Sequence, residues 1–217
     1  MNSLLKVSSQ LLSILFHPLL IIVYVFFLFL LVNPYLFPYA QGREFGAIFL
    51  IIFFTSVVIP GISILLMLGI GFIDSLQMPE RTDRIGPLIV TAISYLWLYL
   101  NIRTHNAIPL PFSQFVLGCL ISIFLAFFIN NFNKISLHAV GMGGLIFITA
   151  YIIETFGHGY SYLSNIVINN IFILAIVIIL SGAVLSSRLI LKAHTTSDVA
   201  GGLLVGLIGQ IIAIRFF

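Results

Sequence analysis

Seven apolar stretches account for most of the sequence, and their length constrains the fold more than any other feature. A helix needs about 20 consecutive apolar residues to cross the hydrocarbon core of a bilayer. The third stretch is shorter and has polar flanks, so six spans is the alternative if residues 86–103 do not cross fully. We predict an all-α, polytopic bundle of transmembrane helices, with spans at about 11–33, 46–73, 86–103, 112–131, 136–156, 165–186 and 196–217.

Composition supports a membrane protein and excludes several other classes. Charged residues make up 7% of the 217 residues, whereas a soluble domain carries roughly 25%. The formal net charge of +3 is small and dispersed, so we expect no nucleic-acid partner. Cys119 is the only cysteine, which excludes a disulfide framework and a cysteine-based metal site.

The chain is predicted to form a single membrane domain over residues 1–217, because it has no repeat, low-complexity segment or polar domain. The first apolar stretch follows an N-terminal segment whose only basic residue is Lys6, and it lacks a small-residue cleavage site, so we expect a retained span and not a removed signal peptide. Pro60 falls inside the second stretch and should kink it. His17 precedes Pro18 and is expected to turn or pack the start of the first span.

Seven spans bring the N-terminus and the connections after spans two, four and six to one membrane face. Most of the basic residues lie on that face. The nine Lys and Arg residues divide into six there (Lys6, Arg81, Arg84, Lys134, Arg188 and Lys192) and three opposite (Arg43, Arg103 and Arg215).

The same three connections lead directly into helix starts. Pro87 suits the first turn of the third span, Ser136 the N-cap of the fifth, and one of Thr195, Thr196 and Ser197 the N-cap of the seventh. Helix N-termini present unpaired N–H groups and the positive end of the helix dipole. Together with the nearby cations, they predict a site for a phosphate-bearing ligand at the membrane surface.

The last connection carries the sharpest chemical pattern. Arg188, His194 and Asp198 lie between apolar segments, and ionisable residues in that setting are usually functional. In a helix beginning near His194, Asp198 lies at i+4 on the same face, where its carboxylate can accept one imidazole N–H. The other ring nitrogen is then free to act as a nucleophile or base, while Arg188 supplies a forked donor suited to phosphate.

These residues resemble the signatures of the type 2 phosphatidic acid phosphatase family, which also includes vanadium haloperoxidases. Ser187-Arg188-x5-His194-x3-Asp198 matches the third signature at every defining position. Ile135-Ser136-Leu137-His138 keeps the Ser and His of the second signature, Pro-Ser-Gly-His. The first signature has a Lys and an Arg-Pro pair with six residues between them, and only Arg81 and Arg84-Ile-Gly-Pro87 correspond to it, with Gln77 at the Lys position. The resemblance covers about residues 74–206.

The resemblance implies a role for each matching residue. His194 would attack phosphorus to give a phosphohistidine, Asp198 would orient it, and His138 would protonate the leaving group. The remaining cations and donors would bind the phosphoryl oxygens: Arg188, Arg84, Arg81, Lys134 and Ser136. The family uses no metal and no cofactor for this chemistry, so none is expected here.

We therefore expect a metal-independent hydrolase that removes phosphate from a lipid phosphomonoester or pyrophosphate, with the apolar tail reaching the site from the bilayer. By resemblance, candidate substrates are phosphatidic acid, phosphatidylglycerol phosphate, undecaprenyl pyrophosphate and lipid A phosphates. The alternative is a non-catalytic lipid-phosphate binding or transport protein. The expected location is a bacterial inner membrane. The cations of the basic face favour a cytoplasmic site by the positive-inside rule, but most of them form the predicted site itself. The resemblance to the phosphatase family favours a site at the outer face.

Overall fold

The computed structural model describes residues 3–37, 42–157, 159–163 and 166–217. Within them, seven helical segments are long and apolar enough to cross a membrane, which confirms the predicted all-α bundle and makes the third stretch a full span. The segments run Ser3–Val32, Glu44–Gly69, Thr82–Ile102, Leu110–Asn130, Leu137–Phe156, Asn170–Ile190 and Thr196–Phe216.

The first two spans are each interrupted, the third opens with a short 3-10 turn before its α-helix, and the other four are single helices. Short helical turns are labelled η; η1, η2 and η4 are 3-10 turns and η3 is a π-helical turn. The elements in order are α1 (Ser3–Leu15), η1 (Pro18–Leu20), α2 (Ile21–Val32), η2 (Pro34–Leu36), α3 (Gly42–Phe53), η3 (Phe54–Val58), α4 (Ile59–Gly69), η4 (Thr82–Arg84), α5 (Ile85–Ile102), α6 (Leu110–Asn130), α7 (Leu137–Phe156), β1 (Tyr160–Leu163), β2 (Ile166–Asn169), α8 (Asn170–Ile190) and α9 (Thr196–Phe216).

The break in the first span occurs at His17-Pro18. A residue before proline is driven out of the helical region, and His17 has extended backbone angles of φ −62° and ψ 138°. Its Nδ1 accepts a hydrogen bond from the Leu19 amide at 3.3 Å, which caps η1. The expected turning role of His17 is thus confirmed, at the junction of two helices. In the second span, the predicted irregularity near Pro60 is a π-helical turn, η3, just before Pro60.

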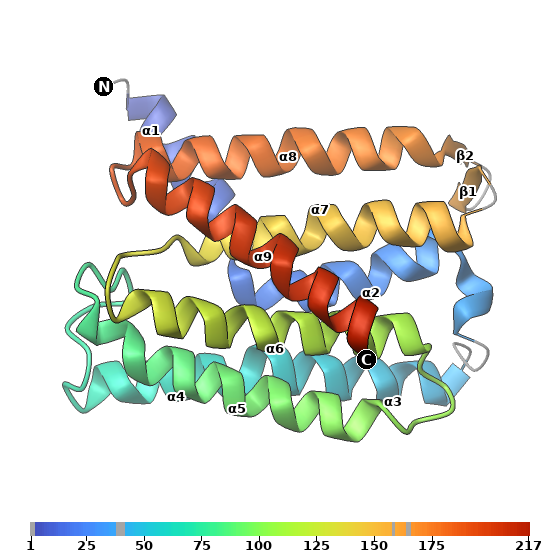
Figure 1. Cartoon of the computed structure of the whole chain (residues 1–217), viewed down its shortest axis with the longest axis horizontal. Helices are drawn as coiled ribbons and strands as arrows, with labels where there is room; N and C mark the ends of the chain where they lie inside the picture. The colour runs from blue at the N-terminus through green and yellow to red at the C-terminus, as the bar shows by residue number, and fades with distance from the viewer. Residues whose placement is uncertain (1–2, 38–41, 158, 164–165) are drawn as a thin grey trace.

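Helix α9 crosses α6 and α7 diagonally and packs closely against both (Figure 1). Glycines permit this approach. A Cβ on Gly206 would collide with the backbone of Val140 and Gly144 in α7, and one on Gly143 would collide with the Leu203 carbonyl. Small residues at crossing points let helix backbones meet in a membrane, where dispersion and polar contacts drive association.

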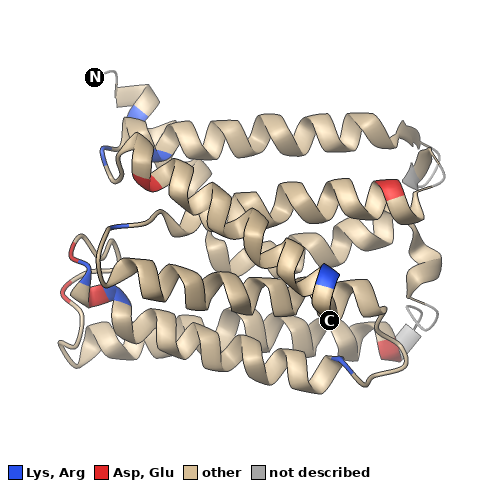
Figure 2. Ribbon diagram, viewed as in Figure 1, with Lys and Arg blue, Asp and Glu red and all other residues tan. Residues whose placement is uncertain are grey.

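The N-terminus and the α4–α5, α6–α7 and α8–α9 connections lie at one end of the bundle, as the seven-span topology predicts (Figure 1). Most of the basic residues cluster at that end (Figure 2). The opposite end carries a two-stranded hairpin in which Tyr160 pairs with Asn169. The sequence predicts the sixth span from residue 165, but the hairpin moves the start of α8 to Asn170.

Candidate functional site

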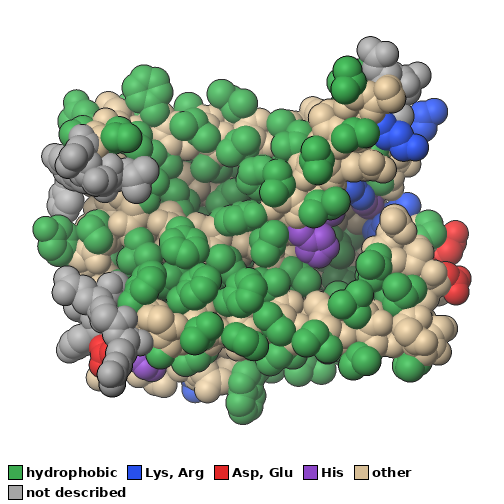
Figure 3. Space-filling view, turned by 180° about the vertical axis from the view of Figure 1, so that it is seen from behind, with side chains coloured by type: hydrophobic (Ala, Val, Ile, Leu, Met, Phe, Trp, Pro, Cys, Tyr) green, Lys and Arg blue, Asp and Glu red, His purple; other side chains and the backbone are tan. Residues whose placement is uncertain are grey.

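A cavity of about 930 Å³ opens at the basic end of the bundle and extends inward between the helices. In the space-filling view a hollow with histidine and basic side chains at its rim interrupts an otherwise apolar face (Figure 3). Its outer part is lined by residues that lie far apart in sequence: His17, Arg84, Lys134, His138, Arg188 and His194. The deeper part is lined mainly by apolar residues of α2, α4 and α5 together with Tyr95, Cys119 and Gln210.

The structure brings His138, Arg188 and His194 to this one cavity, as predicted. His194 immediately precedes α9, whose N-cap is Thr195, one of the three residues expected there. The turn into α9 depends on Lys192, which takes a left-handed φ of 53° just after the end of α8. That turn reverses the chain between Arg188 and His194, so both side chains line the cavity.

Asp198 holds the start of α9 and lies beside His194. Its Oδ2 accepts the Thr195 amide at 3.0 Å, and the Thr195 hydroxyl accepts the Asp198 amide at 3.3 Å, forming a capping box. His194 Nδ1 is 3.4 Å from the same Oδ2, which is ion-pair distance without a formed hydrogen bond. The predicted i, i+4 pair is therefore present, but the carboxylate also serves the helix cap. Because Nδ1 faces Asp198, Nε2 is the His194 nitrogen available for chemistry.

The surroundings of His194 favour its neutral form. Burial lowers its pKa to about 4, and the positive charges of Arg84, Arg188 and Lys134 act in the same direction. The contact with Asp198 opposes this shift without overcoming it. Only 4% of the side chain is exposed. At neutral pH the imidazole therefore keeps the lone pair that a nucleophile needs.

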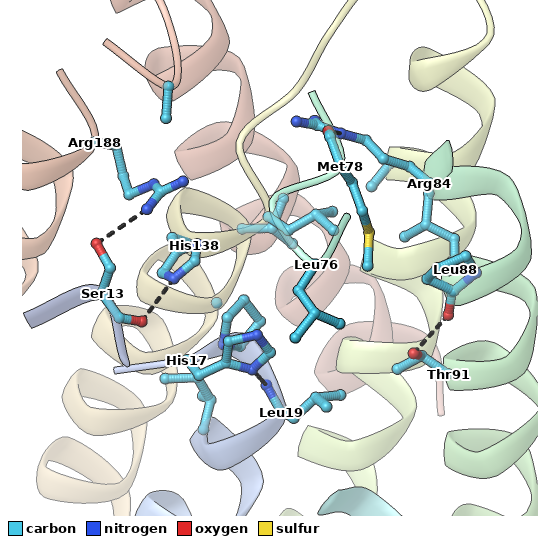
Figure 4. Close-up of a pocket in the computed structure, with 18 of the residues that line it drawn as sticks. Ser13, His17, Leu19, Leu76, Met78, Arg84, Leu88, Thr91, His138 and Arg188 are labelled. Carbon is cyan, nitrogen blue, oxygen red and sulfur yellow. Dashed lines mark hydrogen bonds between the residues drawn. The ribbon is translucent and has the colours of Figure 1, made fainter. Parts of the chain in front are cut away.

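Ser13 of α1 joins two of the predicted site residues (Figure 4). Its hydroxyl accepts a hydrogen bond from Arg188 Nη1 at 3.0 Å and lies 3.1 Å from the Ser187 hydroxyl. Its carbonyl oxygen is 2.9 Å from His138 Nε2. A carbonyl can only accept, so His138 Nε2 carries the hydrogen and Nδ1 is the nitrogen that can exchange a proton.

Arg84 and Lys134 line the cavity, but much of Arg84 is committed to the backbone. Its Nε donates to the Met78 carbonyl at 3.0 Å and its Nη1 to the Ile135 carbonyl at 2.9 Å. Arg84 thereby ties the α4–α5 connection to the α6–α7 connection while keeping its charge beside the site.

Two predicted phosphate-binding residues are not brought to the cavity. Arg81 does not line it and donates Nη1 to the carbonyls of Asn131 and Phe132. Ser136 is fully buried, caps α7 by accepting the Ala139 amide at 3.4 Å, and donates its own amide to the Asp198 carbonyl at 3.2 Å. The predicted N-cap is confirmed, and because the Ser136 hydroxyl accepts the Ala139 amide, it does not face the cavity as a phosphate donor.

The first span contributes site residues that the sequence reasoning missed. Gln10, Ser13 and His17 line the cavity although they lie outside the segment that resembles the phosphatase family. Ser13 and His17 are four residues apart and polar within an apolar stretch. That is the same i, i+4 pattern that singled out His194 and Asp198, so the signal was present in the sequence.

In the part of the chain that the structure describes, no three His, Cys, Asp or Glu side chains are grouped closely enough to hold a metal ion. The fold and the cavity define a polytopic helical membrane protein with a basic, histidine-containing site at one membrane face. No protein-family model matches the chain, and no curated protein or solved structure is significantly similar to it.

Proposed function

We propose that this protein is a metal-independent phosphatase of lipid phosphates that works through a phosphohistidine. The observation that carries the proposal is one cavity with two chemically different parts. Its outer part is lined by His138, His194 and Arg188, and its inner part runs into the apolar interior. A headgroup phosphate fits the first part and an acyl or prenyl tail fits the second.

The chemistry follows from the two histidines. His194 Nε2 attacks phosphorus, forming an N–P bond as the P–O bond to the lipid breaks. The bonding electrons leave with the lipid oxygen, which takes a proton from His138 Nδ1; the neutral ring first receives that proton from the phosphate monoanion of the bound substrate. Water then attacks the phosphohistidine, His138 Nδ1 accepts a proton from that water, and phosphate leaves with His194 restored. Phosphoryl transfer otherwise requires positioned positive charge, which Arg188, Lys134 and the start of α9 supply.

The second candidate is a lipid-phosphate binding or transport protein without turnover. The specific observation in its favour is that donors of Arg84 and Arg188 are already bound to protein oxygens. A fixed basic cradle of this kind recognises a headgroup whether or not chemistry follows.

Phosphate release from lipid phosphates distinguishes the two functions. We expect purified protein to release phosphate from at least one of phosphatidic acid, phosphatidylglycerol phosphate and undecaprenyl pyrophosphate, in the presence of EDTA. His194→Ala should abolish release, because it removes the proposed attacking nitrogen, while leaving the protein folded by circular dichroism. Binding of these lipids without release by the wild type would favour the binding protein, and release by His194→Ala would refute the nucleophile.

The seven spans identify an integral membrane protein. For the membrane itself we propose a bacterial inner membrane with the cavity at the outer face. The cations that favour the cytoplasmic side under the positive-inside rule are those that line or support the cavity, so their number reflects the site as well as orientation.

A further inference from the structure

His17 contacts the candidate site from outside the segments that carry the phosphatase-like motifs. Its ring lies edge-on to that of His138, with centroids 5.7 Å apart, and lines the same cavity. It is an exposed histidine inside a membrane-spanning segment, where a polar side chain is costly unless a ligand or a neighbouring group satisfies its hydrogen bonding.

The hydrogen bonding of His17 fixes which nitrogen can serve a ligand. Nδ1 accepts the Leu19 amide, so the neutral ring carries its hydrogen on Nε2. Nε2 makes no hydrogen bond among the described residues, and the close-up shows the ring beside the cavity with Nδ1 turned toward Leu19 (Figure 4). The chain therefore presents one oriented N–H donor beside the proposed phosphate site.

The depth of His17 indicates which part of a lipid it meets. His138 is the second residue of α7, so its neighbour His17 lies level with the start of a span, where headgroup gives way to hydrocarbon. Leu19 and Ile22 follow it along the cavity wall toward the bilayer interior. Between a phosphoryl group near Arg188 and a tail along Ile22 lies the linkage that joins the two.

We propose that His17 binds an acceptor oxygen in the linkage between the phosphoryl group and the apolar tail, which selects lipid phosphates that carry such an oxygen. An ester or hydroxyl of a glycerol backbone provides it, and so does the inner phosphate of a diphosphate. A simple alkyl monophosphate does not. This inference rests on the proposed lipid-phosphate site and deepens it by naming a substrate class.

Two substitutions separate the cap of His17 from its cavity donor. His17→Asn keeps an acceptor where Nδ1 stands and removes Nε2; Asn33, before Pro34, already caps η2 in this way by accepting the Tyr35 amide at 3.1 Å. His17→Gln does the opposite, because its amide nitrogen reaches the position of Nε2 but its side chain has no acceptor at Nδ1.

The experiment measures binding to protein carrying His194→Ala, so that no ligand is consumed. The ligands are dioleoyl phosphatidic acid, farnesyl diphosphate, hexadecyl phosphate and inorganic phosphate. We expect His17→Asn to weaken binding of phosphatidic acid, farnesyl diphosphate or both by about tenfold, the value of one hydrogen bond to a polar or charged acceptor. Hexadecyl phosphate and inorganic phosphate should be unaffected, and His17→Gln should retain most of the affinity.

Other outcomes overturn the inference in distinguishable ways. If His17→Asn binds every ligand like the parent while His17→Gln is impaired, His17 is only a helix cap. Equal loss for hexadecyl phosphate and phosphatidic acid would assign His17 to the phosphoryl group itself. If the parent protein binds none of the lipids, the proposed function fails along with the inference, whereas binding by the parent without any effect of His17→Asn refutes the inference alone.

Discussion

At the scale of single residues, His194 shows how the site balances opposite charges. Burial and three cations favour the neutral form of its imidazole, and the carboxylate of Asp198 favours the protonated form. Because Asp198 Oδ2 also accepts the Thr195 amide, its charge is shared with the helix start. Burial, with the cations acting in the same direction, outweighs the carboxylate, and the pKa of His194 falls to about 4. The arrangement suits a nucleophile that must be unprotonated before an anionic substrate arrives.

We expect the His194 ring to stay neutral as pH falls through 6.5 and to protonate only near pH 4. Any activity that needs its lone pair should therefore be lost on acidification near pH 4 and not near pH 6.5. Nitrogen-15 shifts of labelled histidine, assigned by loss of the signal in His194→Gln, measure this directly. Lys134→Met should raise the pKa by removing a repelling charge, and Asp198→Asn should lower it. A midpoint near 6.5 in the wild type would contradict the described surroundings.

His138 should matter most when the leaving group needs a proton. Its Nε2 hydrogen is held by the Ser13 carbonyl, which leaves Nδ1 for proton transfer. We expect His138→Ala to slow release from a lipid phosphate, whose alkoxide is strongly basic, by about 10²–10⁴-fold. Nitrophenyl phosphate should be affected much less, because its leaving group departs unprotonated. Steady-state rates on both substrates test this, with Asp198→Asn as the comparison that should slow both alike. Equal losses for His138→Ala would remove its general-acid role.

Sequence reasoning found the residues whose positions follow from spacing and topology. Arg188, His194 and Asp198 lie in or beside one connection. His138 follows the connection after the fourth span, and an even number of spans brings that connection to the same membrane face. It could not tell which side chains turn into the cavity. Ser136 and Arg81 lie on the expected face, yet both satisfy nearby backbone groups. That choice depends on helix rotation and on which carbonyls lie within reach, and neither is encoded in a periodic pattern.

At the scale of elements, the crossing of α9 over α7 sets the geometry of the site. Gly206 meets the Val140 carbonyl and Gly143 meets the Leu203 carbonyl, so the two backbones are nearly in contact. At the outer end of the crossing, the Ser136 amide donates to the Asp198 carbonyl. The start of α7, with His138, is thereby fixed against the start of α9, with Asp198.

Two glycines of α9 provide a matched test of this crossing. A methyl group on Gly206 would strike α7, whereas one on Gly201 meets nothing within 4 Å. We expect Gly206→Ala to destabilise the protein by about 1–3 kcal/mol, because the helices must separate. Gly201→Ala should be neutral or stabilising by about 0.5–1 kcal/mol through helix propensity. Thermal unfolding in detergent compares the two. Equal stabilities would show that the α7–α9 contact is not tight.

The elements themselves were largely predictable, because membrane spans follow from apolar length alone. The departures occur where local chemistry competes with hydropathy. The first span begins at Ser3 and not near residue 11, since α1 carries several serines that lower its apolar signal. The sixth begins at Asn170, because the β1–β2 hairpin takes up apolar residues that a hydropathy pattern assigns to the helix.

At the scale of the whole molecule, the cavity joins the basic end of the bundle to its middle. Helix α6 ends at Asn130 on the basic side, and Cys119 lies 11 residues earlier, which is about 16 Å at the rise of an α-helix. Half of a hydrocarbon core is about 15 Å. Tyr95, Cys119 and Gln210 therefore line the cavity near the middle of the bilayer. A ligand that reaches them from the basic end must carry a long apolar chain.

Cys119, the only cysteine, reports whether such a chain occupies the inner cavity. We expect dioleoyl phosphatidic acid at about ten times its Kd to slow maleimide labelling of Cys119 about tenfold, since only the free fraction reacts. Dihexanoyl phosphatidic acid and inorganic phosphate should protect little, because they fill the outer part and stop short of Cys119. As a control, Trp97→Cys in a Cys119→Ser background presents a thiol at a position that is 63% exposed on α5, and labelling there should not respond to either lipid. Equal protection by the long and short lipids would mean that binding closes the cavity at its mouth, and the tail would then lie elsewhere. Protection by the dioleoyl lipid alone would trace its chain from the phosphate site to the centre of the membrane.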